Sequence, residues 1–210
     1  MPLFYQHNIN HSTKIAVWHI TEMEDFFLLK VPSQKLITHK HKRLQHLAGR
    51  YLLQELYPDF PYHLIEIADT RKPFLPGEKY HFSISHCGDY AAVIVSTDVR
   101  VGIDIELVTP KIELIKHKFI SEDEIGLLNG QWSMVNGKLQ LMTLLWSCKE
   151  AVFKWYGNGG VDFKKNIIIK KISRNDDYNG FVDCRFKKED EVALQIQYRF
   201  FANVILAWII

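Results

Sequence analysis

The sequence has few cysteines and no long hydrophobic run. Only three of its 210 residues are cysteine, namely Cys87, Cys148 and Cys184. They lie far apart and form no CxxC pair or zinc-ligand spacing, so we expect free thiols in a reducing compartment. No window approaches the roughly 18 apolar residues of a membrane span. Residues 1–14 also lack the apolar run of a signal peptide. These absences predict a cytoplasmic protein that makes no membrane contact.

The sequence also lacks a strong excess of charge and a glycine-rich phosphate loop. The net charge is +2, and 47% of the residues are hydrophobic against 24% charged, the balance of an ordinary globular protein. This charge does not favour a nucleic-acid partner. No GxxxxGK[ST] motif occurs. A chain of 210 residues can form one large domain or two small ones.

The distribution of apolar and turn residues predicts an α+β chain with two halves, residues 1–100 and 101–210. Each half is expected to contain a long helix and antiparallel strands. The long helices are expected over residues 33–58, capped by Ser33, and 137–157, closed by Gly157. A shorter helix is expected over residues 119–128, with Ser121 and Glu124 at the spacing of a capping box. The expected strands are residues 14–20, 63–69, 81–86, 90–96, 100–107, 166–172, 180–186, 191–200 and 203–210.

One of these expected strands, "VGIDIELV", carries two carboxylates two residues apart. Side chains alternate along a strand, so Asp104 and Glu106 share one face while Ile103 and Ile105 share the other. An unpaired carboxylate that faces a protein interior costs several kcal/mol or more. The strand therefore requires a positively charged partner for its two acidic residues.

The expected helix 137–157 contains further charged residues. Glu150 and Lys154 are four apart on one face, Trp146 lies one turn earlier, and Lys149 is the immediate neighbour. By itself the Glu–Lys spacing is also typical of an exposed surface pair. Together with the strand carboxylates, however, it gives three hard oxygen ligands without a His or Cys cluster, a set that suits Mg²⁺. Lysines beside such a site favour a phosphate substrate, so the pattern indicates metal-assisted phosphoryl chemistry.

Three segments resemble the motifs of 4′-phosphopantetheinyl transferases. "VGIDIE" and "WSCKEAVFK" resemble the family signatures G-I/V-D-x-E and W-x-x-K-E-A-x-x-K. "RKPFLPGEKYHFSISHC" resembles the K-P and H-F-S/N-I-S-H segment of the Sfp-type branch, in which one chain contains two similar halves. The motifs occur in the family's order, and the resemblance extends from about Lys35 to Phe163. One departure is Cys87, which stands where the family commonly has serine.

The resemblance implies a holo-carrier-protein synthase that depends on Mg²⁺. Such an enzyme transfers the phosphopantetheine arm of coenzyme A (CoA) to a serine of an apo acyl or peptidyl carrier protein and releases adenosine 3′,5′-bisphosphate. The carrier could belong to fatty-acid, polyketide or nonribosomal peptide synthesis. The implied fold has two similar α/β halves related by a pseudo-two-fold, with CoA between them, so a monomer would suffice. Residues 1–100 would contact the CoA nucleotide, and residues 101–210 would form the Mg²⁺ and pyrophosphate site.

The resemblance also implies roles for individual residues. The expected metal ligands are Asp104, Glu106 and Glu150. Asp104, Glu150 and Lys154 would be catalytic, with Glu150 as the hypothetical base and Lys154 on the phosphates. The remaining expected CoA contacts are Lys72, Pro73, Ser85, His86, Lys149, Lys40, Arg43 and His46. Among these, Lys72 and Pro73 match the adenine loop, and Lys40 and Arg43 fall where the family binds the 3′-phosphate. For Glu124, the resemblance suggests a metal-water contact or auxiliary base, while its position alone suggests helix capping.

Two other classes of function remain as alternatives. A different Mg²⁺-dependent nucleotide phosphohydrolase or transferase could use the same carboxylates, but it would leave the "KP" and "SISH" segments unexplained. A non-catalytic module that binds CoA or a carrier protein would be expected to have lost part of the acidic set or Lys154. All of these residues are present.

Overall fold

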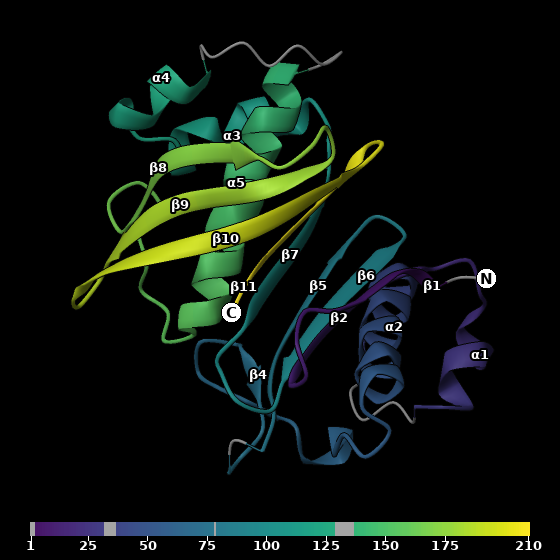
Figure 1. Cartoon of the computed structure of the whole chain (residues 1–210). Coiled ribbons are helices and arrows are strands. Elements are labelled where there is room, and N and C mark those ends of the chain that lie inside the picture. Colours follow the sequence, from purple (N-terminus) through teal and green to yellow (C-terminus); the bar gives the residue numbers. More distant parts are fainter. Residues whose placement is uncertain (1–2, 32–36, 78, 129–136) are drawn as a thin grey trace. The chain divides into compact units, whose positions relative to one another are not determined.

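The computed structural model describes residues 3–31, 37–77, 79–128 and 137–210. The chain combines helices and sheets, which confirms the expected α+β class (Figure 1). It divides into two compact units, Met1–Ile103 and Asp104–Ile210. Within the described ranges, none of the helices has both the length and the apolar character needed to cross a bilayer.

The first unit contains a four-stranded antiparallel sheet with the order β1-β2-β6-β5. Its strands are β1 (Leu3–Asn8), β2 (Thr13–His19), β5 (His81–Cys87) and β6 (Tyr90–Ser96). Helix α2 (Lys40–Leu56) packs on this sheet beside the short helix α1 (Glu24–Leu28) (Figure 1). Leu47, Leu52 and Leu53 of α2 are fully buried in a core that also contains Trp18 and Phe82. A 3-10 turn, η1 (Tyr62–Leu64), and the two-stranded sheet of β3 (Glu66–Ile67) and β4 (Pro73–Phe74) connect α2 to β5.

The elements of the first unit differ from expectation in three places. Helix α2 begins at Lys40 rather than near residue 33, because His39 adopts an extended backbone and its side chain caps the amide of Lys42. The expected cap, Ser33, and the start of the family resemblance, Lys35, lie outside the described residues. The expected strand 63–69 is shortened to β3 because η1 occupies its first residues. Strand β1 was not predicted, since its mostly exposed side chains show little apolar alternation.

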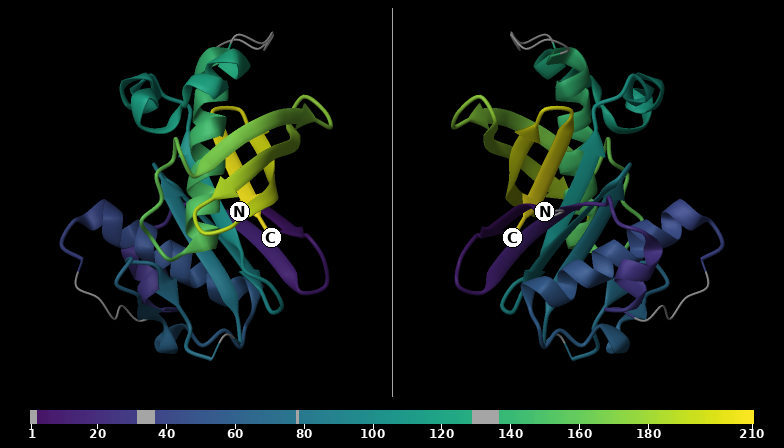
Figure 2. Two further views of the ribbon diagram at one scale, coloured as in Figure 1. Left: turned by 90° about the vertical axis from the view of Figure 1, so that its left-hand side faces the viewer. Right: turned by 90° about the vertical axis from the view of Figure 1, so that its right-hand side faces the viewer.

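The second unit contains a five-stranded sheet with the order β7-β11-β10-β9-β8. Its strands are β7 (Gly102–Leu107), β8 (Ile167–Arg174), β9 (Asn179–Lys187), β10 (Glu191–Phe201) and β11 (Val204–Ile209). The last four follow one another as antiparallel neighbours. Helix α5 (Gly137–Tyr156) lies across one face of this sheet (Figure 2). The core forms where apolar side chains of α5 meet those of β8 to β11.

The helices of the second unit agree with the expectation only in part. Helix α3 (Lys111–Phe119) was not predicted, because only Ile112 and Phe119 of its side chains are buried. The single helix expected over residues 119–128 is instead the 3-10 turn η2 (Glu122–Glu124) followed by α4 (Ile125–Leu128). Helix α5 ends at Tyr156, just before the expected Gly157, whose φ of 77° is the left-handed conformation that favours glycine after a helix.

Gly180 of β9 lies so close to its neighbours that a larger residue cannot fit. A Cβ atom there would lie 2.0 Å from the carbonyl oxygen of Ser173 and 2.6 Å from the hydroxyl of Tyr198. We therefore expect Gly180→Ala to lower the free energy of unfolding by more than about 2 kcal/mol in urea denaturation. Gly126→Ala is the matched control, because a Cβ at this position in α4 meets nothing within 4 Å. Equal stability of the two variants would contradict this account of Gly180.

Candidate functional site

The two acidic residues of β7 both face helix α5. Asp104 is 2% exposed, and its Oδ2 accepts a hydrogen bond from Ser147 Oγ at 2.8 Å. Its Oδ1 lies 2.6 Å from Lys154 Nζ, the positively charged partner that this strand required. Glu106 Oε1 accepts a hydrogen bond from Trp146 Nε1 at 3.1 Å. One helix therefore contacts both carboxylates.

Glu150, on the same helix, lies close enough to these carboxylates to be affected by their charge. Burial raises the pKa of Glu150 to about 7, and the negative charges of Asp104 and Glu106 act in the same direction. The positive charge of Lys154 lowers that pKa and so opposes them in part. The three acidic residues thus form a cluster in which an added cation would be stabilised electrostatically.

The acidic cluster suits a hard divalent cation by the type of its donor atoms. All three side chains are carboxylates, and repulsion among them contributes to the raised pKa of Glu150. Among the described residues, however, no group of three or more His, Cys, Asp or Glu side chains is arranged to hold a metal ion. Here the ammonium of Lys154 supplies the positive charge next to Asp104. The residues therefore fit Mg²⁺ in chemistry and charge, but they do not form a coordination shell.

Lys149 is not placed to contact a phosphate, contrary to the expectation from the motif. Its side chain is fully buried, and Nζ lies 2.7 Å from Glu124 Oε2. Nζ also donates to the carbonyl oxygens of Phe119, at 2.6 Å, and Phe163, at 2.9 Å. Burial lowers the pKa of the Lys149 amine, and Glu124 opposes this shift. Residues 149 and 150 point about 100° apart around α5, so they cannot both face the acidic cluster, and the packing of α5 turns Lys149 away from it.

Glu124 has the structural role that its position suggested. It is fully buried, and its Oε2 also accepts the backbone N–H of Ser121 at 2.9 Å, as in a capping box. Its Oε1 accepts the N–H of Ile169 at 2.8 Å. Glu124 thus ties the start of η2 to β8 and, through Lys149, to α5.

In the first unit, the expected nucleotide contacts occupy β4, β5 and the residues beside them. Pro73 begins β4, and the preceding Lys72 is half-buried. Burial and the charge of nearby Arg100 lower the pKa of the Lys72 amine. On β5, Ser85 is 6% exposed while His86 is exposed. Arg100 was not singled out from the sequence, because it lies just before the motif "VGIDIE" and is not part of the family signature.

Helix α2 contacts the turn that follows Ser85 and His86. Gln45 Nε2 donates to the carbonyl oxygen of Gly88 at 2.7 Å, and His41 Nε2 lies 3.0 Å from the same oxygen. These contacts bring the expected 3′-phosphate region and the "SISH" segment together within one unit. Neither His41 nor Gln45 was predicted to have a role, since their partner is a distant backbone carbonyl that leaves no local sequence signal.

The three residues of α2 that were expected to bind CoA differ in their surroundings. The Lys40 side chain is exposed. The Arg43 guanidinium pairs with both carboxylate oxygens of Glu24, at 2.5 and 2.7 Å, so a phosphate would have to compete with that carboxylate. His46 Nε2 accepts a hydrogen bond from Arg50 Nε at 3.0 Å. Lys40 is therefore the most accessible of the three.

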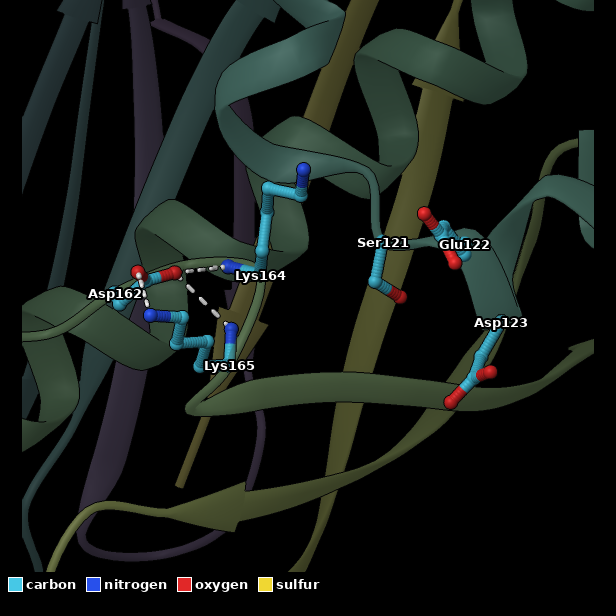
Figure 3. Close-up of a pocket in the computed structure, with 6 residues that line it drawn as sticks. All are labelled: Ser121, Glu122, Asp123, Asp162, Lys164 and Lys165. Atoms are coloured by element: carbon cyan, nitrogen blue, oxygen red, sulfur yellow. Dashed lines mark hydrogen bonds and ion pairs between the residues drawn. The ribbon is translucent and has the colours of Figure 1, made fainter.

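The second unit contains two hollows that share Asp162 and Lys164. One, of ≈ 500 Å³, is lined by Ser121, Glu122, Asp123, Asp162, Lys164 and Lys165. Figure 3 shows Lys164 and Lys165 around the Asp162 carboxylate, which accepts both of their backbone N–H groups. The other, of ≈ 320 Å³, is lined by Lys118, Trp146, Val161, Asp162, Phe163 and Lys164. Trp146 therefore lines a hollow and also contacts Glu106.

Comparison with known families agrees with the motifs in the second unit. A family model described as the 4′-phosphopantetheinyl transferase superfamily matches residues 100–207, just over half of the chain. The match runs from two residues before β7 into β11. It includes Asp104, Glu106, Glu150 and Lys154.

Individual relatives show similarity at low identity. The chain is 28% identical to L-aminoadipate-semialdehyde dehydrogenase-phosphopantetheinyl transferase of Xenopus laevis over 134 residues, which is 54% of this chain and 43% of that protein. It is 27% identical to 4′-phosphopantetheinyl transferase AcpT of Escherichia coli O157:H7 over 121 residues, 55% of this chain and 59% of the relative. It is 37% identical to enterobactin synthase component D of Escherichia coli K12 over 82 residues, 38% of this chain and 39% of the relative. The chain thus matches less than two thirds of the length of these relatives.

Proposed function

Because the chain belongs to the 4′-phosphopantetheinyl transferase superfamily, we propose that it transfers the phosphopantetheine arm of CoA to a serine of an apo carrier protein. Adenosine 3′,5′-bisphosphate is the second product. The observation that carries this proposal is the cluster of Asp104, Glu106 and Glu150 beside Lys154, which lies in the segment that matches the family. The Sfp-type assignment and the identity of the carrier are parts of the proposal.

The residues of the acidic cluster have complementary roles in this reaction. Mg²⁺, when bound by Asp104, Glu106 and Glu150, would neutralise charge on the CoA pyrophosphate. Lys154 contacts the phosphate oxygens, because its ammonium already lies at the edge of the cluster and is partly exposed. A pKa of about 7 suits Glu150 to accept the proton of the attacking serine near neutral pH. Catalysis is then mainly positioning and electrostatic stabilisation of charge on the phosphates.

The first unit supplies the nucleotide site in this proposal. Lys72 and Pro73 contact the adenine, and Ser85 and His86 contact the nucleotide phosphates. Lys40 contacts the 3′-phosphate and His46 contacts the nucleotide, whereas Arg43 can bind the 3′-phosphate only by exchanging Glu24 for phosphate. The positive charges of Lys72 and Arg100 support an anionic ligand here.

The proposal also includes the roles of the two halves, the oligomeric state, the cellular location and the class of carrier. Residues 1–100 serve the nucleotide, and residues 101–210 serve Mg²⁺ and pyrophosphate. A monomer carries the full activity, and the reaction takes place in the cytoplasm. The carrier belongs to fatty-acid, polyketide or nonribosomal peptide synthesis.

The proposal is tested by the mass of the carrier. Apo carrier proteins of the fatty-acid, polyketide and peptide types are incubated with the protein, CoA and Mg²⁺, and their intact masses are measured with and without EDTA. A mass increase of one phosphopantetheine group that EDTA abolishes is the expected result. If no carrier is modified by folded protein and CoA is instead hydrolysed, a phosphohydrolase is supported. Binding of CoA without any turnover supports a non-catalytic module.

The raised pKa of Glu150 predicts how pH affects stabilisation by Mg²⁺. A carboxyl whose folded-state pKa is raised from 4.5 to about 7 contributes stability that is lost as pH rises through this window. Mg²⁺ binds the ionised form and removes the repulsion, so the increase in Tm with Mg²⁺ should be larger near pH 8 than near pH 6. Differential scanning calorimetry of the protein with and without Mg²⁺ measures this difference. A Tm increase that is equal at both pH values would rule out Glu150 as a ligand that ionises in this range.

A further inference from the structure

Two consecutive residues of α5 each donate a hydrogen bond to a different carboxylate of β7. Ser147 Oγ donates to Asp104 Oδ2 at 2.8 Å, and Trp146 Nε1 donates to Glu106 Oε1 at 3.1 Å. The carboxylates are two residues apart on a strand, so their Cα atoms lie about 7 Å apart on one face. Consecutive helix side chains diverge by about 100°, so each donor can reach a separate carboxylate.

Packing holds both donors in place. The Ser147 side chain is fully buried. The Trp146 ring packs edge-on against Phe119, with centroids 5.2 Å apart, and is tilted against Phe163 at 5.5 Å. A carboxylate that accepts a hydrogen bond from a fixed donor has fewer accessible orientations. The same turn of α5 that precedes Glu150 therefore restricts the two acidic residues of β7.

We propose that Trp146 and Ser147 are positioning residues that orient Asp104 and Glu106 to bind a divalent cation. This inference rests on the proposed function, which supplies the cation. Ligands that are already oriented lose less conformational freedom when the metal binds, and partners of metal ligands commonly affect metal affinity by about 10–100-fold. Neither residue needs to contact substrate for this role.

Helix α5 offers a matched control for each residue. Thr143 is 1% exposed, and its Oγ1 donates to the carbonyl oxygen of Leu139, one turn earlier in the same helix, at 2.8 Å. Trp155 is partly buried and packs against Phe186 at 6.1 Å. Thr143→Ala and Trp155→Phe thus remove a buried hydroxyl and an indole from α5 without removing a hydrogen bond to the acidic cluster.

The test measures Mg²⁺ binding in two ways for S147A, W146F, T143A, W155F and the unaltered full chain. The first measurement is the rise of Tm in a Mg²⁺ titration without CoA, and the second is the Mg²⁺ dependence of carrier modification. For S147A and W146F we expect the half-saturating Mg²⁺ concentration to rise about tenfold or more in both measurements. Their kcat at saturating Mg²⁺ should largely recover, and the two controls should stay within about twofold of the unaltered chain.

The outcomes separate this inference from the proposed function. If S147A and W146F lose stability but keep the half-saturating Mg²⁺ concentration of the unaltered chain, their role is packing alone and the inference is overturned. If the unaltered chain modifies its carrier but neither measurement responds to Mg²⁺, the inference fails while the transferase function stands. If the carrier is not modified but Mg²⁺ still raises Tm and the two variants weaken that response, the inference stands and the proposed reaction fails. Should one variant not fold, the other decides the result.

Discussion

Replacement of Asp104 by Asn should reduce carrier modification by about a thousandfold or more while leaving the protein folded. Asn keeps the size of Asp104 and can still accept the hydrogen bond from Ser147, but it removes the negative charge that faces Lys154. A neutral amide is also a much poorer Mg²⁺ ligand than a carboxylate. The loss should therefore appear in turnover and in Mg²⁺ binding rather than in stability.

The measurement compares initial rates of carrier modification with Tm in the presence and absence of Mg²⁺. Asp183→Asn is a suitable control, because Asp183 loses the same charge from the same unit but contacts Gln195 on an exposed part of the sheet. We expect D183N to retain normal turnover. Normal turnover of folded D104N would remove Asp104 from the proposed metal site.

Replacement of Lys149 by Met should lower the free energy of unfolding by about 3–5 kcal/mol, because it leaves the buried carboxylate of Glu124 without its charged partner. The carbonyl oxygens of Phe119 and Phe163 lose a donor as well. The double variant K149M/E124Q should recover part of the loss, since a neutral amide costs less to bury than an unpaired carboxylate. Urea denaturation near pH 7 gives the three free energies.

Lys154→Met is the informative comparison for Lys149, since both residues are lysines of one motif. Lys154 is partly exposed, but its removal leaves the buried carboxylate of Asp104 without its charged partner, so K154M should lower the free energy of unfolding and also strongly reduce turnover. K149M should lose stability but keep near-normal turnover per folded molecule. If K149M has normal stability and low turnover, the result would instead support the phosphate contact that the motif suggested for Lys149.

The strands and the long helix of the second unit could be predicted because their signals are local. The apolar alternation of "GIDIEL" and the helical spacing of "LLWSCKEAVFK" both appear in the sequence, as does the glycine that ends α5. Elements with few buried side chains, such as β1 and α3, escaped prediction because burial is what produces the pattern. The start of α2 also depended on an extended backbone at His39, which the helical spacing upstream did not reveal.

The sequence by itself determined which residue types lie near one another along β7 and α5, and it led to the family. It placed Asp104 and Glu106 on one face because side chains alternate along a strand. Only the tertiary structure decided how the two lysines of the motif are used. Helical geometry fixes the angle between Lys149 and its neighbour Glu150, but not which of them faces the sheet's acidic residues. Packing of α5 on the sheet settles that choice: Lys154 meets Asp104, and Lys149 is buried against Glu124, 25 residues away in the chain.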